Sequence, residues 1–210
     1  MKAESQSRHR ILTGCLVIQM MLVAVSGHAA TVSFSADVKR SNTNQKGMQA
    51  DGRIMVSEEA IRTESQVNGE PLVVIYQSKN KQVFTLLPAK GQFSRVSDGR
   101  LDFKMPPTPR DPASPCQQDK HYQCQPRGME RIDGRTAEAW QIYVRGSSEK
   151  DSRSFQLWVD VELGVAIRER YDDGMLVEMQ NIRVGPQDGQ LFKVPAGYQE
   201  VVLPAQAKQP

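Results

Sequence analysis

The sequence predicts a mainly β protein built on a single, strongly curved antiparallel sheet with few short helices. Apolar and polar residues alternate with a period of two in many short segments, as in strands that are buried on one side. Turn dipeptides such as Asn68-Gly69 and Asp133-Gly134 separate these segments, which is typical of β-hairpins. Beyond the first thirty residues, no stretch of the sequence shows strong helical periodicity.

The first half of this pattern predicts six strands. In the first strand, Val32, Phe34, Ala36 and Val38 alternate with polar residues. A polar loop at 41–47 follows, and the alternation then resumes up to Val56. The other strands expected here cover 61–67, 72–77, 82–87 and 93–96.

Segment 97–125 interrupts the alternation and predicts a long proline-rich surface loop. It contains prolines at 106, 107, 109, 112 and 115, together with Cys116 and Cys124. Proline lacks a backbone N–H donor and disfavours both helices and central strands, so we expect no regular element here. Loops of this length within a compact domain often serve as lids or binding elements.

Strands resume after this loop and complete the sheet. They are predicted at 129–132, 136–144, 155–160, 165–171 and 175–184. Any helix is expected to be short, either near Leu191 or within the proline-rich loop. The total of about nine to eleven strands is too many for a flat sheet, which must curl or close. We therefore expect an open half-barrel.

The N-terminal segment has the three parts of a secretory signal peptide. Lys2, Arg8 and Arg10 form a basic start, 11–25 is mostly apolar, and small residues surround Ala29. An apolar run of about 15 residues is shorter than the ~20 that span a bilayer. We therefore expect residues 1–29 to be removed, leaving one domain at 30–210 in a bacterial periplasm.

Cys15 raises the alternative of a lipid-modified N-terminus, since 12–15 reads Leu-Thr-Gly-Cys. In a lipoprotein signal the cysteine ends the apolar run, but here most of the run follows Cys15. We therefore expect Cys15 to be lost with the signal peptide.

The charge of the mature chain is close to neutral. The full sequence has 27 Lys and Arg against 24 Asp and Glu, a net charge of +3. Loss of Lys2, Arg8, Arg10 and Glu4 leaves 24 against 23, a net charge of +1. This balance does not indicate nucleic acid or an anionic surface as a partner.

Short motifs spread over most of the predicted strands resemble the outer-membrane lipoprotein-sorting, or LolA-like, superfamily. In its first half the family has a Gly-x-apolar strand, an apolar-Arg-x-acid strand and a hairpin whose second arm ends in proline. In its second half it has a Trp-apolar-Asp…Gly hairpin and a closing segment. The matching segments here are 52–56, 61–64, 74–88 with Gln92, 158–160 with 163–164, and 191–201.

The resemblance implies an open half-barrel whose concave apolar face holds acyl chains. Members of the family carry lipoproteins, bind other lipids or sense envelope stress. The true carriers have an Arg-Pro pair, whose arginine helps to hold a helical lid, where this chain has Glu58-Glu59. The lid helices also have no counterpart in the pattern, so the chain resembles an uncharacterised periplasmic relative rather than the carrier itself.

The candidate ligand-binding residues are large apolar side chains on the predicted strands. Their alternation places them on strand faces, and with few helices to cover such a face it would be open to a ligand. The alternative is that they form an ordinary core under a loop. These residues are Phe34, Ile54, Ile75, Phe84, Trp140, Ile142, Trp158 and Met179.

Cys116 and Cys124 are the only cysteines outside the signal peptide, and we expect them to form a disulfide in an oxidising compartment. A metal site with Asp119 and His121 is the alternative, but the spacing matches no familiar zinc pattern. His121 is also the only histidine left after processing, and no catalytic motif is present. We therefore expect no metal, no cofactor and no enzymatic activity.

Together these features predict a periplasmic binding protein for a hydrophobic ligand, in envelope transport or sensing. The ligand would be an acyl chain, a lipid or a lipoprotein, and an envelope protein is a further possible partner. The alternative is a non-catalytic interaction protein that uses the disulfide loop as a scaffold.

Export gives the first testable prediction. Protein purified from the periplasm should have an intact mass that corresponds to loss of about 29 residues. A mature chain that begins at a diacylated Cys15 would contradict this prediction and make the protein a lipoprotein.

Overall fold

A computed structural model of the protein describes residues 32–45, 49–97, 111–117, 120–145 and 154–202. The expected signal peptide and its cleavage site lie outside these residues. Among the described residues, no helix is long and apolar enough to cross a membrane.

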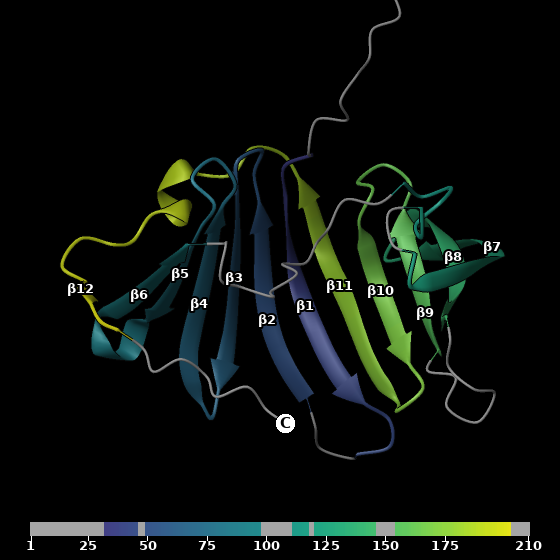
Figure 1. The fold of residues 1–210 in the computed structure, drawn as a ribbon, viewed down its shortest axis with the longest axis horizontal. Coiled ribbons are helices and arrows are strands. Elements are labelled where there is room, and N and C mark those ends of the chain that lie inside the picture. The colour runs from purple at the N-terminus through teal and green to yellow at the C-terminus, as the bar shows by residue number, and fades with distance from the viewer. Residues whose placement is uncertain (1–31, 46–48, 98–110, 118–119, 146–153, 203–210) are drawn as a thin grey trace, which may run out of the picture.

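The described residues form one open, curved sheet, as the sequence predicted, but with twelve strands where about nine to eleven were expected (Figure 1). Their order across the sheet is β12-β6-β5-β4-β3-β2-β1-β11-β10-β9-β8-β7. The first six strands are β1 (Phe34–Asn42), β2 (Gln49–Val56), β3 (Ala60–Val67), β4 (Glu70–Gln77), β5 (Gln82–Leu87) and β6 (Gln92–Ser97). The others are β7 (Tyr122–Ile132), β8 (Arg135–Val144), β9 (Ser154–Asp160), β10 (Ala166–Tyr171), β11 (Met175–Val184) and β12 (Gln199–Glu200).

Only two short 3-10 helices accompany the strands within the described residues. They are η1 (Pro88–Lys90) and η3 (Gly189–Phe192), and η3 confirms the short helix expected near Leu191. The pairing is antiparallel throughout except for β12, which pairs parallel with β6. This last pairing is a departure from the purely antiparallel sheet that we expected.

The boundary of the proline-rich loop was wrong at its C-terminal end. Tyr122, Gln123, Cys124 and Gln125 belong to β7, where Cys124 pairs with Ile142. Pro126 is tolerated because the register shifts at this residue and because β7 is the last strand of the sheet. A missing N–H donor therefore disrupts the ladder less than it would in a central strand.

The pairing of β1 with β11 joins the two halves of the sheet. Residues of β1 lie opposite residues more than a hundred positions later, for example Val38 opposite Met179. A register shift between Ser35 and Asp37 marks a bulge, where Asn181 has a φ of 53°. The Asn181 backbone N–H donates to Asp133 Oδ2 over 2.7 Å, and its side-chain amide donates to Asp37 Oδ2 over 2.8 Å. The bulge therefore ties β11 to β1 and to the β7–β8 turn.

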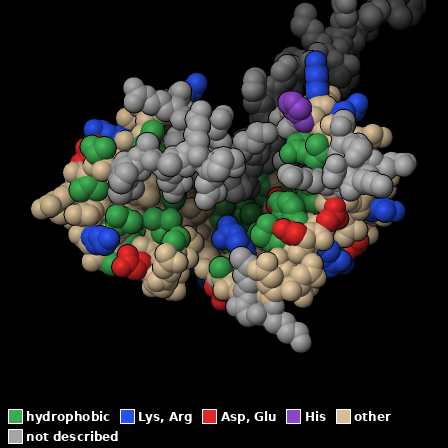
Figure 2. All heavy atoms as spheres, turned by 60° about the horizontal axis from the view of Figure 1, so that its bottom comes forward, with side chains coloured by type: hydrophobic (Ala, Val, Ile, Leu, Met, Phe, Trp, Pro, Cys, Tyr) green, Lys and Arg blue, Asp and Glu red, His purple; other side chains and the backbone are tan. Residues whose placement is uncertain are grey.

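Buried side chains form three clusters. The central cluster includes Phe34, Ile54, Val56 and Met179 from the middle strands, together with Trp158. A second cluster surrounds Ile75 and Phe84, and a third surrounds Trp140 and Ile142. The space-filling view shows hydrophobic side chains on both flanks of a central hollow (Figure 2).

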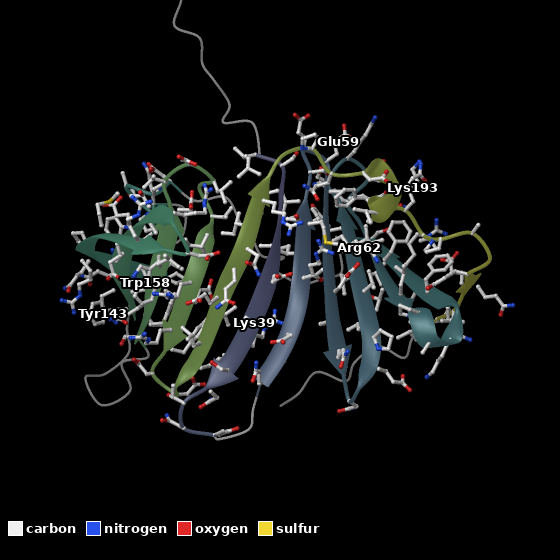
Figure 3. All side chains as sticks on the ribbon, turned by 180° about the vertical axis from the view of Figure 1, so that it is seen from behind. Lys39, Glu59, Arg62, Tyr143, Trp158 and Lys193 are labelled. Carbon is white, nitrogen blue, oxygen red and sulfur yellow. A yellow bond between two sulfur atoms is a disulfide. The ribbon has the colours of Figure 1, made fainter. Side chains whose placement is uncertain are left out.

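The second cluster is covered by the C-terminal segment. Phe192 of η3 packs with Ile75 and Phe84, and Tyr198 packs beside it. Arg62 Nη1 donates to the Leu191 carbonyl and Gln77 Nε2 to the Phe192 carbonyl, each over 2.9 Å. Figure 3 shows Arg62 beside the segment that carries Lys193. Since Met55 joins this cluster while Ile54 and Val56 join the central one, the C-terminal end of β2 is buried on both sides.

Gly52 of the Gly-x-apolar motif has a structural explanation. A Cβ atom at this position would lie 2.7 Å from the Glu64 backbone oxygen. Contacts that short are not tolerated between a Cβ and backbone, so only glycine allows β3 to approach β2 this closely.

Asp160 of the Trp-apolar-Asp motif stabilises the β9–β10 turn through several hydrogen bonds. Its carboxylate is fully buried and accepts the backbone N–H groups of Glu162 and Leu163 over 2.9 and 2.8 Å. Arg135 of β8 donates to both of its oxygens, and this hydrogen bonding raises the pKa of Arg135 above its ordinary value. The motif therefore stabilises the fold rather than forming a site.

Replacement of Asp160 should strongly destabilise the sheet. Asp160→Ala leaves Arg135 and two backbone donors without their acceptor, and we expect a loss of about 3–5 kcal/mol. Thermal unfolding of the purified domain would measure this as a fall in Tm of about 10 °C.

Glu162→Gln is the matched control, since Glu162 also accepts from Arg135 but its side chain is 78% exposed. We expect this change to alter stability by about 0.5 kcal/mol or less. Equal effects of the two substitutions would contradict the central role of Asp160.

Candidate ligand-binding site

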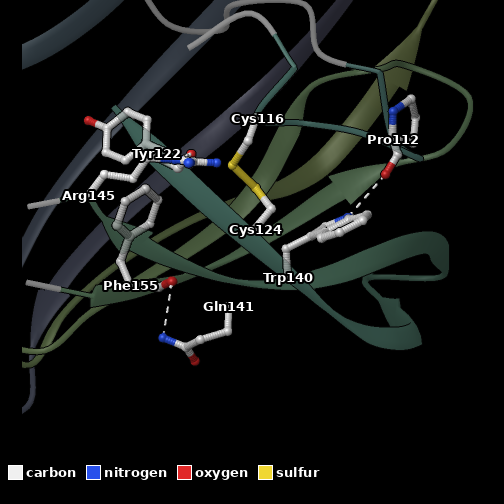
Figure 4. Close-up of a disulfide and its surroundings, with 8 residues drawn as sticks. All are labelled: Pro112, Cys116, Tyr122, Cys124, Trp140, Gln141, Arg145 and Phe155. Carbon is white, nitrogen blue, oxygen red and sulfur yellow. Dashed lines mark hydrogen bonds between the residues drawn. A yellow bond between two sulfur atoms is a disulfide. The ribbon is translucent and has the colours of Figure 1, made fainter. Parts of the chain in front are cut away.

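A cavity of about 500 Å³ lies beside the disulfide, at the β7 end of the sheet. It is formed by the segment that precedes β7, by the start of β7 and by β8. Its described lining residues are Ser114, Cys116, Gln117, Lys120, Tyr122, Gln123, Cys124, Trp140 and Arg145. Figure 4 shows Tyr122 and Arg145 on one side of the disulfide and Trp140 on the other.

The Cys116–Cys124 disulfide predicted from the sequence is present, with Cα atoms 6.0 Å apart. It ties the turn segment at 111–117 to β7, and both cysteines pack against the third cluster. Because the thiols are joined to each other, they are not free to ligate a metal. Among the described residues, no group of three or more His, Cys, Asp and Glu side chains could hold a metal ion.

Trp140 forms the apolar floor of the cavity and anchors the segment above it. Only 7% of its surface is exposed, and its indole Nε1 donates to the Pro112 carbonyl over 3.0 Å. On the ladder, Trp140 lies opposite Pro126 of β7 and Leu157 of β9. The disulfide and this hydrogen bond both attach the described segment 111–117 to the sheet.

Aromatic rings continue the apolar surface away from the disulfide. The rings of Tyr122 and Phe155 meet edge to face with centroids 5.9 Å apart. Phe155 in turn stacks on Tyr171 at 5.3 Å. Tyr122 and Phe155 pack against the buried side chains of the third cluster, which include Ile142 and Leu157. The aromatic rings therefore extend from Tyr122 at the cavity across β9 to β10.

The eight candidate residues are all buried, but the structure does not bring them to one face. Phe34, Ile54, Trp158 and Met179 belong to the central cluster. Ile75 and Phe84 lie under the C-terminal segment, which the sequence pattern did not place over them. Of the eight, only Trp140 lines the cavity, and Ile142 packs beside it.

Trp158 is shielded from solvent by arginines. The guanidinium carbons of Arg168 and Arg170 lie 5.6 and 5.7 Å from its ring centroid. Arg168 is itself paired with Glu178. These contacts give Trp158 a packing role and separate it from the cavity residue Trp140.

The sequence did not single out Lys120, Tyr122 or Arg145 as site residues. A signal existed for Tyr122, because Tyr122 and Cys124 alternate with Gln123 and Gln125 in the manner of a strand. The proline-rich interval hid this alternation. Lys120 and Arg145 carried no such signal, because their meeting at one cavity depends on the β7–β8 pairing.

No protein family and no curated protein matches this sequence. Solved structures do match the fold. One is an uncharacterized conserved protein from Thermus thermophilus, with a TM-score of 0.52 and 13% identity, covering 81% of this chain and 90% of that one. Another is the MucA/MucB complex of Pseudomonas aeruginosa, with a TM-score of 0.53 and 19% identity over 83% of this chain. The match spans 59% of that second chain.

A LolA superfamily protein, NE2245 from Nitrosomonas europaea, is also among the matched structures, with a TM-score of 0.34 and 10% identity over 78% of this chain and 90% of that one. At these identities the similarity concerns the fold. The open, curved antiparallel sheet implied by the sequence resemblance is present in this chain.

Removal of the disulfide should loosen the cavity but spare the sheet. Replacing both Cys116 and Cys124 by Ser should lower the free energy of unfolding by about 2.5 kcal/mol, the chain-entropy estimate for a loop of this size. The β-sheet circular dichroism should remain, because the bond links a turn segment to an edge strand.

The local effect can be read from Trp140 alone in a Trp158→Phe background, where its emission should shift to the red as the segment at 111–117 loosens. A Trp140→Phe background reports Trp158 and should show no shift. Loss of the sheet signal would contradict this account of the disulfide.

Proposed function

We propose that this protein is an exported, non-catalytic binding protein that holds a hydrophobic ligand in the cavity beside Trp140. The observation that carries the proposal is the cavity itself. Its volume of about 500 Å³ falls in the range of ligand sites, roughly 300–1,000 Å³, which combine apolar walls with a few polar groups. Trp140, Tyr122 and the disulfide supply the apolar part of the lining, beside five polar or charged residues. An acyl chain is the ligand class that suits this apolar part.

The surroundings of the cavity support an elongated apolar ligand. Tyr122 is half-buried rather than fully packed, and Phe155 and Tyr171 extend the aromatic surface from it. A chain that enters beside Trp140 would meet these rings next. The resemblance of the sequence to the LolA-like superfamily and the signal-like N-terminus support a periplasmic setting, where the disulfide is stable.

The composition of the cavity supports binding rather than catalysis. Its nine described lining residues include the Ser114 hydroxyl but no histidine and no carboxylate that could activate it. Its two cations, Lys120 and Arg145, are suited to holding a ligand in place. The proposed role of the cavity is therefore to bind a ligand without a chemical reaction.

Fluorescence of single-tryptophan variants tests the proposal directly. In delipidated Trp158→Phe protein, titration with lysolipids should quench or shift Trp140 emission in a saturable manner. In delipidated Trp140→Phe protein, the remaining Trp158 should not respond, since it lies in the central cluster under Arg168 and Arg170. A silent Trp140, or equal responses from both residues, would contradict this site.

A second substitution separates binding from stability. Tyr122→Ser removes an aromatic wall that is half exposed, so we expect lysolipid affinity to fall about tenfold while Tm falls by a few degrees. Tyr76→Ser in β4 removes an equally half-buried tyrosine far from the cavity and should leave affinity unchanged. If neither variant nor the parent protein binds an apolar ligand, the interaction-scaffold alternative takes its place.

A further inference from the structure

The cavity carries positive charge that no described acidic side chain neutralises. Lys120 and Arg145 are among its nine described lining residues, whereas none of the nine is an aspartate or glutamate. Lys120 lies just before β7, and its ammonium group has no hydrogen-bond or ion-pair partner among the described residues. Its charge is therefore open to a ligand in the cavity.

Arg145 is held so that its guanidinium faces the same space. Its backbone N–H donates to the His121 carbonyl over 2.7 Å, and its Nε donates to the Tyr122 carbonyl over 3.0 Å. These two bonds fix the side chain beside the Tyr122 ring (Figure 4). The terminal Nη1 and Nη2 atoms have no partner within the described ranges, so they are the groups left to bind a ligand.

Acidic residues on adjoining segments are engaged elsewhere. Asp111 Oδ1 accepts the Ala113 backbone N–H over 3.0 Å. Asp172 Oδ2 accepts the Ser154 backbone N–H over 2.7 Å, and both of its oxygens accept the Ser154 hydroxyl. Neither carboxylate is paired with Lys120 or Arg145, so within the described part of the chain these two cations keep their charge available to a ligand.

We propose that the cavity selects amphiphiles with an anionic head group, a phosphate or a carboxylate, over neutral ones. This inference rests on the proposed function and specifies its ligand class. Lys120 and Arg145 bind the head group, and Arg145 offers two parallel N–H donors that match the oxygens of either anion. Tyr122, Trp140 and the disulfide contact the first part of the apolar chain.

The expected selectivity is moderate because the cations are solvent-exposed. Exposed ion pairs contribute little individually, so two of them should favour an anionic lysolipid by roughly fivefold to tenfold over a zwitterionic one. Since screening weakens exposed charges, this preference should shrink as salt rises from about 50 to 300 mM.

The test uses Trp158→Phe protein and lysolipids of one acyl chain below their critical micelle concentrations. Lysophosphatidylglycerol, which has a net negative charge, should bind more tightly than zwitterionic lysophosphatidylcholine. A fatty acid of the same chain length tests whether a carboxylate head group gives the same preference. The Lys120→Gln/Arg145→Gln double variant should lose the preference while still binding both lysolipids. Equal affinities in the parent protein, or a preference that survives the double substitution, would overturn the inference.

Two controls complete the experiment. Lys79→Gln/Lys90→Gln removes two cations from the β4–β5 turn and η1, at the other end of the sheet, and should keep the preference. Inorganic phosphate alone should leave Trp140 emission unchanged, because the apolar chain is part of the ligand. A response to phosphate alone would indicate that the cavity binds a free anion. It would contradict the proposal that the ligand is an amphiphile. Binding of both lysolipids without preference would overturn only this inference, whereas absence of all binding would also overturn the proposed function.

Discussion

The pairing of β1 with β11 is the interaction on which the rest of the sheet depends. It connects a meander of strands β2 to β6 with a second run of strands β7 to β11, and without it these would be two small sheets. Neither half would bury the central cluster, because Phe34, Ile54 and Met179 come from strands on both sides of the junction. The bulge at Asn181 fixes the register of this pairing and links it to Asp133 and Asp37. A slip by one residue would turn Met179 out of the core.

The described residues contain only two short helices, so irregular segments must cover the apolar side chains on the two sides of the curved sheet. On one flank the C-terminal segment returns across the sheet, and its Phe192 and Tyr198 cover Ile75 and Phe84. The two hydrogen bonds from Arg62 and Gln77 fix the backbone of this segment. An irregular segment can cover a sheet in this way because its carbonyl groups are satisfied by side chains of the strands beneath.

The β7 end of the sheet is covered differently, and this difference explains the cavity. There the described part of the covering segment, 111–117, is attached to the sheet at discrete points by the disulfide and by the hydrogen bond from Trp140. Attachment at points rather than along a continuous interface leaves space between them. Of the two cations at this cavity, Lys120 precedes β7 and Arg145 follows β8. The pairing of β7 with β8 therefore shapes the cavity and also brings its two positive charges together.

The fold class, most of the strands and the partnership of Cys116 with Cys124 follow from the sequence alone. Alternation and turn dipeptides act over a few residues, and two cysteines in the mature chain allow a single pairing. The start of β7, the short strand β12 and the identity of the apolar residues that meet depend on the tertiary structure. Ile75 and Phe84 face a segment more than a hundred positions away, and Trp158 is shielded by arginines of the next strand. Alternation shows that a side chain points to one side of a strand, but what covers that side, and where a space remains, depends on long-range pairing.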